Sequence, residues 1–169
     1  QFEQRDTVTK RYVAIAWGAA PWTKRLLDQP MMLDMDAKYK VKMRIAAAGE
    51  GLSAGTECEI VERRRSPITG REYSMVKCTL LTGRQHQIRL HLAAAGLPIV
   101  GDKLYGPDDG LFARGVDDEL TDEDRSLLEL PRHALHAAEL SLDHPISGER
   151  LTLSAPLPED LRTFWESLS

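Results

Sequence analysis

Apolar and polar side chains alternate along several segments of this 169-residue chain, and an alternation of period two predicts β-strands. In residues 9–18 it places Tyr12 and Ala14 on one face of a strand and Val13 and Ile15 on the other. The other strands predicted in this way cover residues 38–44, 56–62, 72–80, 133–142 and 150–153. Turn residues at 66–70 and 143–148 predict that the last four of these segments form two hairpins.

The pattern changes to a helical period in two places. Residues 85–95 bring Ile88 and Leu92 to one side, and Gly96 predicts where that helix ends. Residues 158–168 begin with proline followed by two acids, which suits the start of a helix. Strands outnumber helices, so we predict the α+β class, with a mainly antiparallel mixed sheet and flanking helices.

Charge is distributed unevenly around the formal net value of −4. Residues 107–130 hold nine acids and two bases, whereas residues 10–105 hold sixteen bases and nine acids. We interpret 107–130 as an acidic surface insertion within a single domain that covers residues 1–169. Inside it, Thr121 and Asp124 have the spacing of a helix capping box. The basic remainder is compatible with binding a polyanion, although a mixed surface that binds nothing is an equal alternative.

Composition excludes several classes of protein. No apolar run approaches the length of a membrane-spanning helix. The first residues, Gln1 to Asp6, lack a signal-peptide pattern. Two cysteines, Cys58 and Cys78, do not make a disulfide framework. These features indicate a protein of the reducing cytoplasm.

Chemistry-bearing side chains are densest in the segment Thr82-Gly83-Arg84-Gln85-His86-Gln87-Ile88-Arg89-Leu90-His91, which continues into residues 96–106. A glycine turn there joins a strand to a helix, and backbone amides at a helix start can hold a phosphate. Arginine grips planar oxyanions with two parallel hydrogen bonds. A solvated helix with its charges in water is the alternative explanation.

This segment resembles the signature of RluA-type RNA pseudouridine synthases, T-G-R-x-H-Q-I-R followed by G-x-P-I-x-G-D-x-x-Y-G. Every fixed position is filled, the second part by Gly96-Leu97-Pro98-Ile99-Val100-Gly101-Asp102-Lys103-Leu104-Tyr105-Gly106. Three more segments agree with family patterns: residues 10–18 with K-x-Y-x-A, residues 135–140 with L-H-A, and residues 144–156 with the closing strands. The resemblance covers nearly the whole chain and is loosest in residues 107–130.

The resemblance implies the pseudouridine synthase catalytic fold and the cofactor-free isomerisation of specific uridines in ribosomal or transfer RNA. The family's nucleophile is an aspartate in an H-R-L-D-type motif tens of residues before the K-x-Y strand. Only eleven residues precede Tyr12 here, and Asp6 among them has the wrong neighbours. The chain is therefore expected to be the C-terminal portion of a catalytic domain, inactive alone. A non-catalytic RNA-binding module of the same fold stays open as an alternative.

The resemblance also implies site residues. Tyr12 is expected to stack on the flipped base, although a core tyrosine is the simpler interpretation of the residue alone. Arg89 is expected to pair with the absent aspartate, so that here it would be mobile or hold a solvent anion; a surface ion pair is the alternative. The residues expected to bind RNA or substrate are Lys10, Arg84, His86, Gln87, Ile88 and Leu135. For Gln87, orienting the turn is a second possible role.

Other groups are interpreted as structural or left open. Asp102 and Tyr105 fit a turn in which the carboxylate accepts backbone amides. The run Arg63–Arg65 with Arg71, at a hairpin tip, suits either distant RNA or a solvated loop. A zinc hydrolase is disfavoured because no H-E-x-x-H motif occurs. We expect no metal, no cofactor and no membrane partner, and an RNA-binding monomer.

Overall fold

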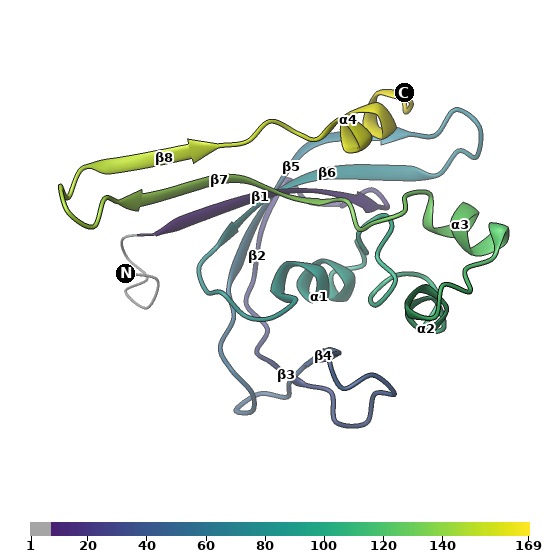
Figure 1. Cartoon of the computed structure of the whole chain (residues 1–169), viewed down its shortest axis with the longest axis horizontal. Coiled ribbons are helices and arrows are strands. Elements are labelled where there is room, and N and C mark those ends of the chain that lie inside the picture. The colour runs from purple at the N-terminus through teal and green to yellow at the C-terminus, as the bar shows by residue number, and fades with distance from the viewer. Residues whose placement is uncertain (1–7) are drawn as a thin grey trace.

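A six-stranded sheet in the order β2-β5-β6-β1-β7-β8 is the centre of the computed structural model, which describes residues 8–169 (Figure 1). Its strands are β1 (Thr9–Trp17), β2 (Lys24–Leu27), β5 (Thr56–Arg65), β6 (Glu72–Leu80), β7 (Leu135–Asp143) and β8 (Arg150–Ser154). Each neighbouring pair in it is antiparallel. The remaining elements are β3 (Met31–Leu33), β4 (Met43–Ile45), α1 (Gln87–Ala94), α2 (Leu111–Val116), α3 (Asp122–Leu128) and α4 (Glu159–Glu166). The predicted α+β class is confirmed; Asp6 lies outside the described residues.

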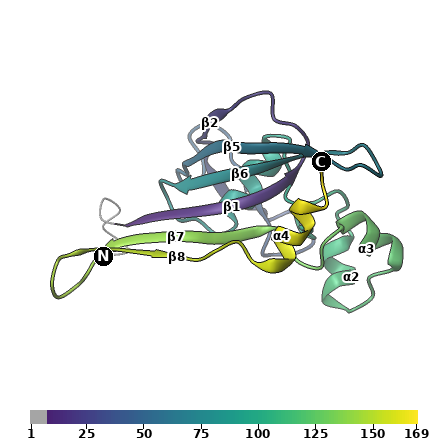
Figure 2. The same cartoon turned by 90° about the horizontal axis from the view of Figure 1, so that it is seen from above.

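Helices cover both faces of the sheet. Figure 1 shows α1 on one side and α4 on the other, and Figure 2 shows α4 lying over the strands. Ile88 and Leu92 of α1 are buried in the main core, together with Ile15 of β1 and Trp165 of α4. Leu90 of α1 belongs to a second, smaller core under β3 and β4. Helix α1 is therefore held between two apolar clusters, which fixes its orientation.

The predicted hairpin of β5 and β6 is confirmed, and β5 extends three residues further than predicted, to Arg65. The arginine run at its tip is engaged within the chain. Arg63 donates to the carbonyls of Ala20 and Trp22, and Arg64 to that of Trp165. Two ion pairs, Arg65–Glu72 and Arg71–Glu129, complete the set. These guanidinium groups attach neighbouring segments to the sheet.

The predicted strand at residues 38–44 is wrong except for its last two residues, which belong to β4. A turn replaces it, because the Asp34 carboxylate accepts the amides of Asp36 and Ala37. The ring of Tyr39 packs edge-on against Phe112, with centroids 4.7 Å apart, instead of joining a sheet face. Alternation in this lysine-rich segment therefore did not indicate a strand.

The acidic insertion folds as two short helices, α2 and α3. The predicted capping box is present, since Thr121 and Asp124 exchange hydrogen bonds of 3.1 Å each. Helix α2 was not predicted. Glu129, which follows α3, accepts hydrogen bonds from Tyr73 and Trp17 and so attaches the insertion to the sheet. Within residues 8–169 no helix is long and apolar enough to span a bilayer.

Candidate active site

The turn before α1 is organised by the buried amide of Gln87. Its oxygen accepts from the Thr82 hydroxyl at 2.7 Å and from the Arg84 amide at 3.0 Å. Its nitrogen donates to the Gly55 carbonyl and the Thr56 hydroxyl, both at 2.9 Å. Both lone pairs and both N–H groups are therefore used within the chain. Gln87 orders the turn, the second of its two predicted roles.

His86 precedes α1 in the left-handed backbone region, with φ of 56°. Its Nδ1 lies 3.0 Å from the Tyr105 hydroxyl, which accepts the Met43 amide at 2.8 Å. The hydroxyl and Nδ1 therefore share one hydrogen bond, and the tautomer of the ring decides which of them donates. Burial, with the charge of Arg89, lowers the pKa of His86. The lowered pKa favours the neutral form of the ring.

Arg89 forms a two-pronged ion pair with Asp102. Its Nε and Nη2 lie 2.6 and 2.7 Å from the two carboxylate oxygens, and its guanidinium carbon lies 5.1 Å from the Tyr105 ring centroid. Burial raises the pKa of Asp102, but the hydrogen bonds and charge of Arg89 outweigh it and leave that pKa below its ordinary value. The expectation that Arg89 would be mobile or hold a solvent anion is wrong, because the turn after α1 supplies the Asp102 carboxylate.

Tyr12 faces the side of the sheet that α1 covers. In the register, Tyr12 is opposite Cys78, and side chains opposite one another in an antiparallel pair share a face. Cys78 is in turn opposite Cys58 of β5, and Thr56, two residues before Cys58, is on the same face and contacts Gln87 of α1. Tyr12 and the helix that bears Arg89 therefore lie on the same side of the sheet. Their contacts are separate: Arg89 pairs with Asp102, while Tyr12 packs at the edge of the main core.

A pocket of about 350 Å³ lies beside Tyr12. Its lining is mostly apolar, with the ammonium-bearing side chain of Lys10 next to the tyrosine. Residues of β1, β7 and the β8 end line it, namely Lys10, Tyr12, Ala137, Glu139, Leu140, Leu153, Ser154 and Ala155. An apolar pocket with few polar groups is typical of ligand sites.

Comparison with known proteins assigns the chain to a family. Residues 1–94 match the family model for RNA pseudouridylate synthase. The chain belongs to this family. Among curated pseudouridine synthases, it is 37% identical over 168 residues to the ribosomal large subunit pseudouridine synthase D of Xanthomonas campestris. It is 33% identical over 162 residues to an uncharacterized RNA pseudouridine synthase of Bacillus subtilis.

These matches cover 99% and 96% of the chain but only 46% and 45% of the two relatives, so this pseudouridylate synthase chain spans about half of their length. Human RNA pseudouridylate synthase domain containing 1 is a solved structure with the same fold. It aligns with a TM-score of 0.75 at 26% identity, over 99% of this chain and 61% of the human one.

The other predicted binding residues of this pseudouridylate synthase chain fall into two groups. Lys10 and Arg84 flank the glycine turn: a Cβ on Gly83 would lie 3.7 Å from the Lys10 Nζ, and Arg84 donates to the Ser53 carbonyl at 3.1 Å. Ile88 is 4% exposed and is a core residue. Leu135 is half-buried opposite Ala14, on the same face as Tyr12. The structure thus places Lys10 and Arg84 beside the turn before α1, and it leaves Ile88 little surface for a ligand.

Sequence reasoning missed His133. Burial is the main cause that lowers the pKa of His133. The positive charge of Arg89 lowers this pKa further, and the negative charge of Asp102 raises it. The half-buried ring therefore stands close to the Arg89–Asp102 pair. The available signal was its position two residues before the L-H-A segment. The chain around it, residues 132–134, lies against residues 100–101. Within residues 8–169, no three His, Cys, Asp or Glu side chains are placed to share a metal ion.

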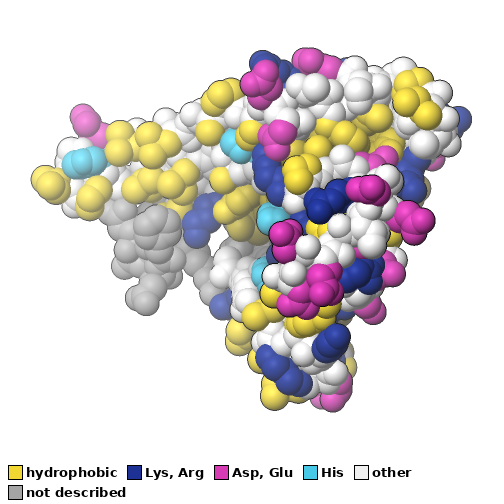
Figure 3. Space-filling view, turned by 45° about the vertical axis from the view of Figure 1, so that its right-hand side comes forward, with side chains coloured by type: hydrophobic (Ala, Val, Ile, Leu, Met, Phe, Trp, Pro, Cys, Tyr) yellow, Lys and Arg dark blue, Asp and Glu magenta, His cyan; other side chains and the backbone are white. Residues whose placement is uncertain are grey.

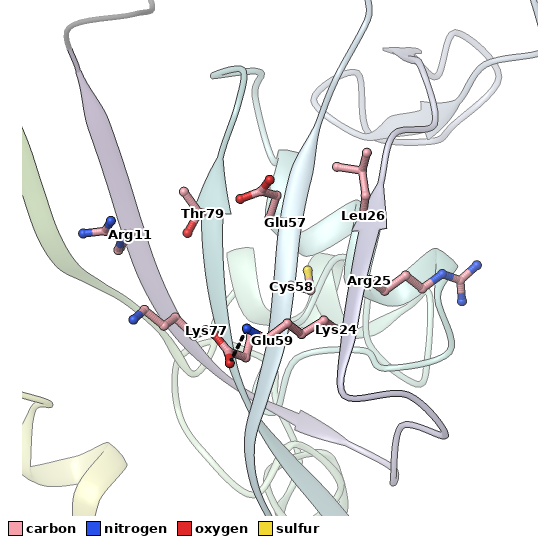
Figure 4. Close-up of a pocket in the computed structure, with 9 residues that line it drawn as sticks. All are labelled: Arg11, Lys24, Arg25, Leu26, Glu57, Cys58, Glu59, Lys77 and Thr79. Atoms are coloured by element: carbon pink, nitrogen blue, oxygen red, sulfur yellow. Dashed lines mark ion pairs between the residues drawn. The ribbon is translucent and has the colours of Figure 1, made fainter.

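Charged side chains of both signs lie close together on the side of the molecule shown in Figure 3, with His side chains among them. A second pocket, of about 530 Å³, opens on the other face of the sheet (Figure 4). It mixes Arg11 and Lys77 with Glu57 and a Lys24–Glu59 ion pair. With Arg25, its lining holds four basic residues and two acidic ones.

Proposed function

We propose that this chain is the part of an RNA pseudouridine synthase that receives an everted uridine, with Tyr12 and Arg89 on the substrate side. One observation carries the proposal: the complete T-G-R-x-H-Q-I-R segment folds around α1 on the face that Tyr12 shares. The nucleophilic aspartate would come from the H-R-L-D-type motif that this sequence lacks. The substrate class is a uridine in structured ribosomal or transfer RNA, acted on by a cytoplasmic, monomeric protein without metal or cofactor.

The reaction needs no other molecule. The bond from uracil N1 to ribose C1′ breaks, the base turns, and C5 bonds to the same carbon. The proton on C5 leaves and N1 takes one up, so the atomic composition is unchanged. The uridine must leave its base stack to react, at a cost of roughly a few kcal/mol. The protein therefore contributes mainly by holding the base and an aspartate in register.

Each side chain has a role that its surroundings support. Arg89 would hold the nucleophilic carboxylate ionised, since an adjacent cation lowers the pKa of an aspartate by about 1–3. The Tyr12 ring, half-exposed beside the 350 Å³ pocket, would stack on the uracil. Arg84, Lys10 and the ring of His86 lie around the turn, where they would contact phosphates. Leu135 would contact the base edge.

The test expresses the full-length gene product that carries this chain in cells whose own copy of the gene is deleted, and it measures pseudouridine in the RNA of those cells. We expect the wild type to restore the modification. Arg89→Ala should lower turnover severely, by about 10²-fold or more if an oriented charge is lost, and Tyr12→Phe should lower it less. Arg132→Ala is the matched control, because Arg132 forms an equally two-pronged but exposed pair with Asp160.

Near-normal turnover in Arg89→Ala would contradict the assignment. RNA binding by the wild type without any pseudouridine would instead support the non-catalytic RNA-binding module.

A further inference from the structure

We propose that Asp102 is a positioning residue for the uridine chemistry: it holds Arg89 by one edge of the guanidinium and so turns the opposite edge towards the substrate. This inference rests on the proposed function and deepens it. It gives Asp102 a role beyond the turn capping that the sequence indicates. Asp102 does not touch the substrate and acts through Arg89.

The atoms used in the pair leave a complete edge of Arg89 available. Asp102 accepts from Nε and Nη2. A guanidinium has five N–H donors, so both hydrogens of Nη1 and the second hydrogen of Nη2 remain. Within residues 8–169 Nη1 has no hydrogen-bond acceptor, since Arg89 donates through Nε and Nη2. The side chain of Arg89 is 15% exposed, whereas that of Asp102 is fully covered. The end that reaches solvent therefore belongs to the arginine, and it fits one more two-pronged oxyanion.

Asp102 is itself fixed from several directions. The carboxylate oxygen that binds Nη2 also accepts the amides of Leu104 and Tyr105, at 2.9 and 3.0 Å. The preceding Gly101 has φ of 75°, and a Cβ there would lie 2.1 Å from the Arg132 carbonyl oxygen. Only glycine allows this approach, so the turn places the carboxylate at one point.

The ring of Tyr105 fixes the second direction. It lies against the guanidinium of Arg89, and its hydroxyl is held by the Met43 amide and His86. Arg89 is thus gripped along one edge by Asp102 and supported on one face by Tyr105. Its free edge cannot rotate without breaking the buried pair, which is the condition for a preorganised catalytic charge.

Two other pairs in the described residues have the same fork but not this setting. Arg114 and Asp124 pair through the same atoms, with side-chain exposures of 34% and 10%. Arg132 and Asp160 do so at 41% and 40%. The second pair is exposed on both sides, and in the first the arginine is more exposed than Arg89. A fully covered carboxylate distinguishes Asp102 from both.

The experiment measures kcat and KM for pseudouridine formation by the full-length gene product carrying Asp102→Asn, Arg89→Ala or both changes. Asp160→Asn is the matched control. We expect Asp102→Asn to lower kcat about 10²-fold, the typical cost of misplacing a catalytic group, with KM changed less than about 3-fold. In the Arg89→Ala background, Asp102→Asn should have no further effect, because its action runs through Arg89. Asp160→Asn should behave as wild type.

Several results would overturn the inference. If the losses from Asp102→Asn and Arg89→Ala multiply in the double variant, Asp102 acts independently of Arg89. If Asp102→Asn changes only KM, or leaves kcat unchanged, it does not position the charge. Should Asp102→Asn unfold, Arg89→Lys tests the same point, since lysine keeps the charge but cannot be gripped by a fork; a wild-type kcat there refutes the inference. An inactive wild type would refute the proposed function instead.

Discussion

Replacing Gln87 by methionine tests whether one buried amide holds the site turn together. The change keeps the length of the side chain but removes hydrogen bonds to Thr82, Arg84, Gly55 and Thr56. All partners except the Arg84 amide keep another hydrogen bond, so few groups are left wholly unsatisfied. Each bond is then worth about 0.5–1.5 kcal/mol, and the loss in free energy of unfolding should be roughly 2–6 kcal/mol.

The assay is equilibrium unfolding in urea, with thermal unfolding beside it. For a domain of this size, 1 kcal/mol corresponds to about 2–4 °C in Tm, so a fall of at least about 4 °C is expected. Gln85→Met is the matched control, because Gln85 is exposed two residues earlier in the same turn and should change little. A loss below about 1 kcal/mol for Gln87→Met would refute the reasoning, since the amide would then be replaceable by water.

Two further predictions concern stability. Glu129→Gln should lower the free energy of unfolding by about 2–4 kcal/mol, because Tyr73 and Trp17 lose a charged acceptor. Thermal unfolding measures the change, with Glu123→Gln at an exposed position as the control. A Tm of Glu129→Gln equal to that of the wild type would contradict this prediction. The pKa of Asp102 is depressed in the folded chain, so its contribution is present above its ordinary pKa of about 3.9 and is lost as pH falls through the folded value. In acid, the free energy of unfolding should therefore fall less steeply with pH in Asp102→Asn than in the wild type. Identical slopes in the two proteins would contradict this prediction.

Long regular segments of the fold were predictable from the sequence. The strand of residues 9–18 and the β5–β6 hairpin alternate over many residues, so the period is unambiguous. The capping box of α3 was predictable because it is a local contact between Thr121 and Asp124. By contrast, β3 and β4 have three residues each, too few for any period to appear. They form because Met31 and Met43 pack in the smaller core together with Leu90 of α1, which is a tertiary contact and not a local one.

The site was predictable in its residues but not in its pairings. The motif identified Arg89 and Asp102, yet the ion pair between them depends on how residues 96–101 fold back after α1. Sequence spacing does not specify that path. Likewise, Gln87 was assigned two roles because its identity is compatible with either, and only the positions of Thr82 and Thr56 distinguish them.

The attachment of the acidic insertion through Glu129 has a consequence for how a polyanion approaches. It keeps the exposed acids of α3 and of the segment between α2 and α3, such as Glu123 and Asp117, at a fixed place beside the sheet. Negative charges along that flank repel a polyanion over a range of about 8–10 Å at moderate salt. If the chain receives RNA as proposed, the insertion would disfavour its approach from that flank.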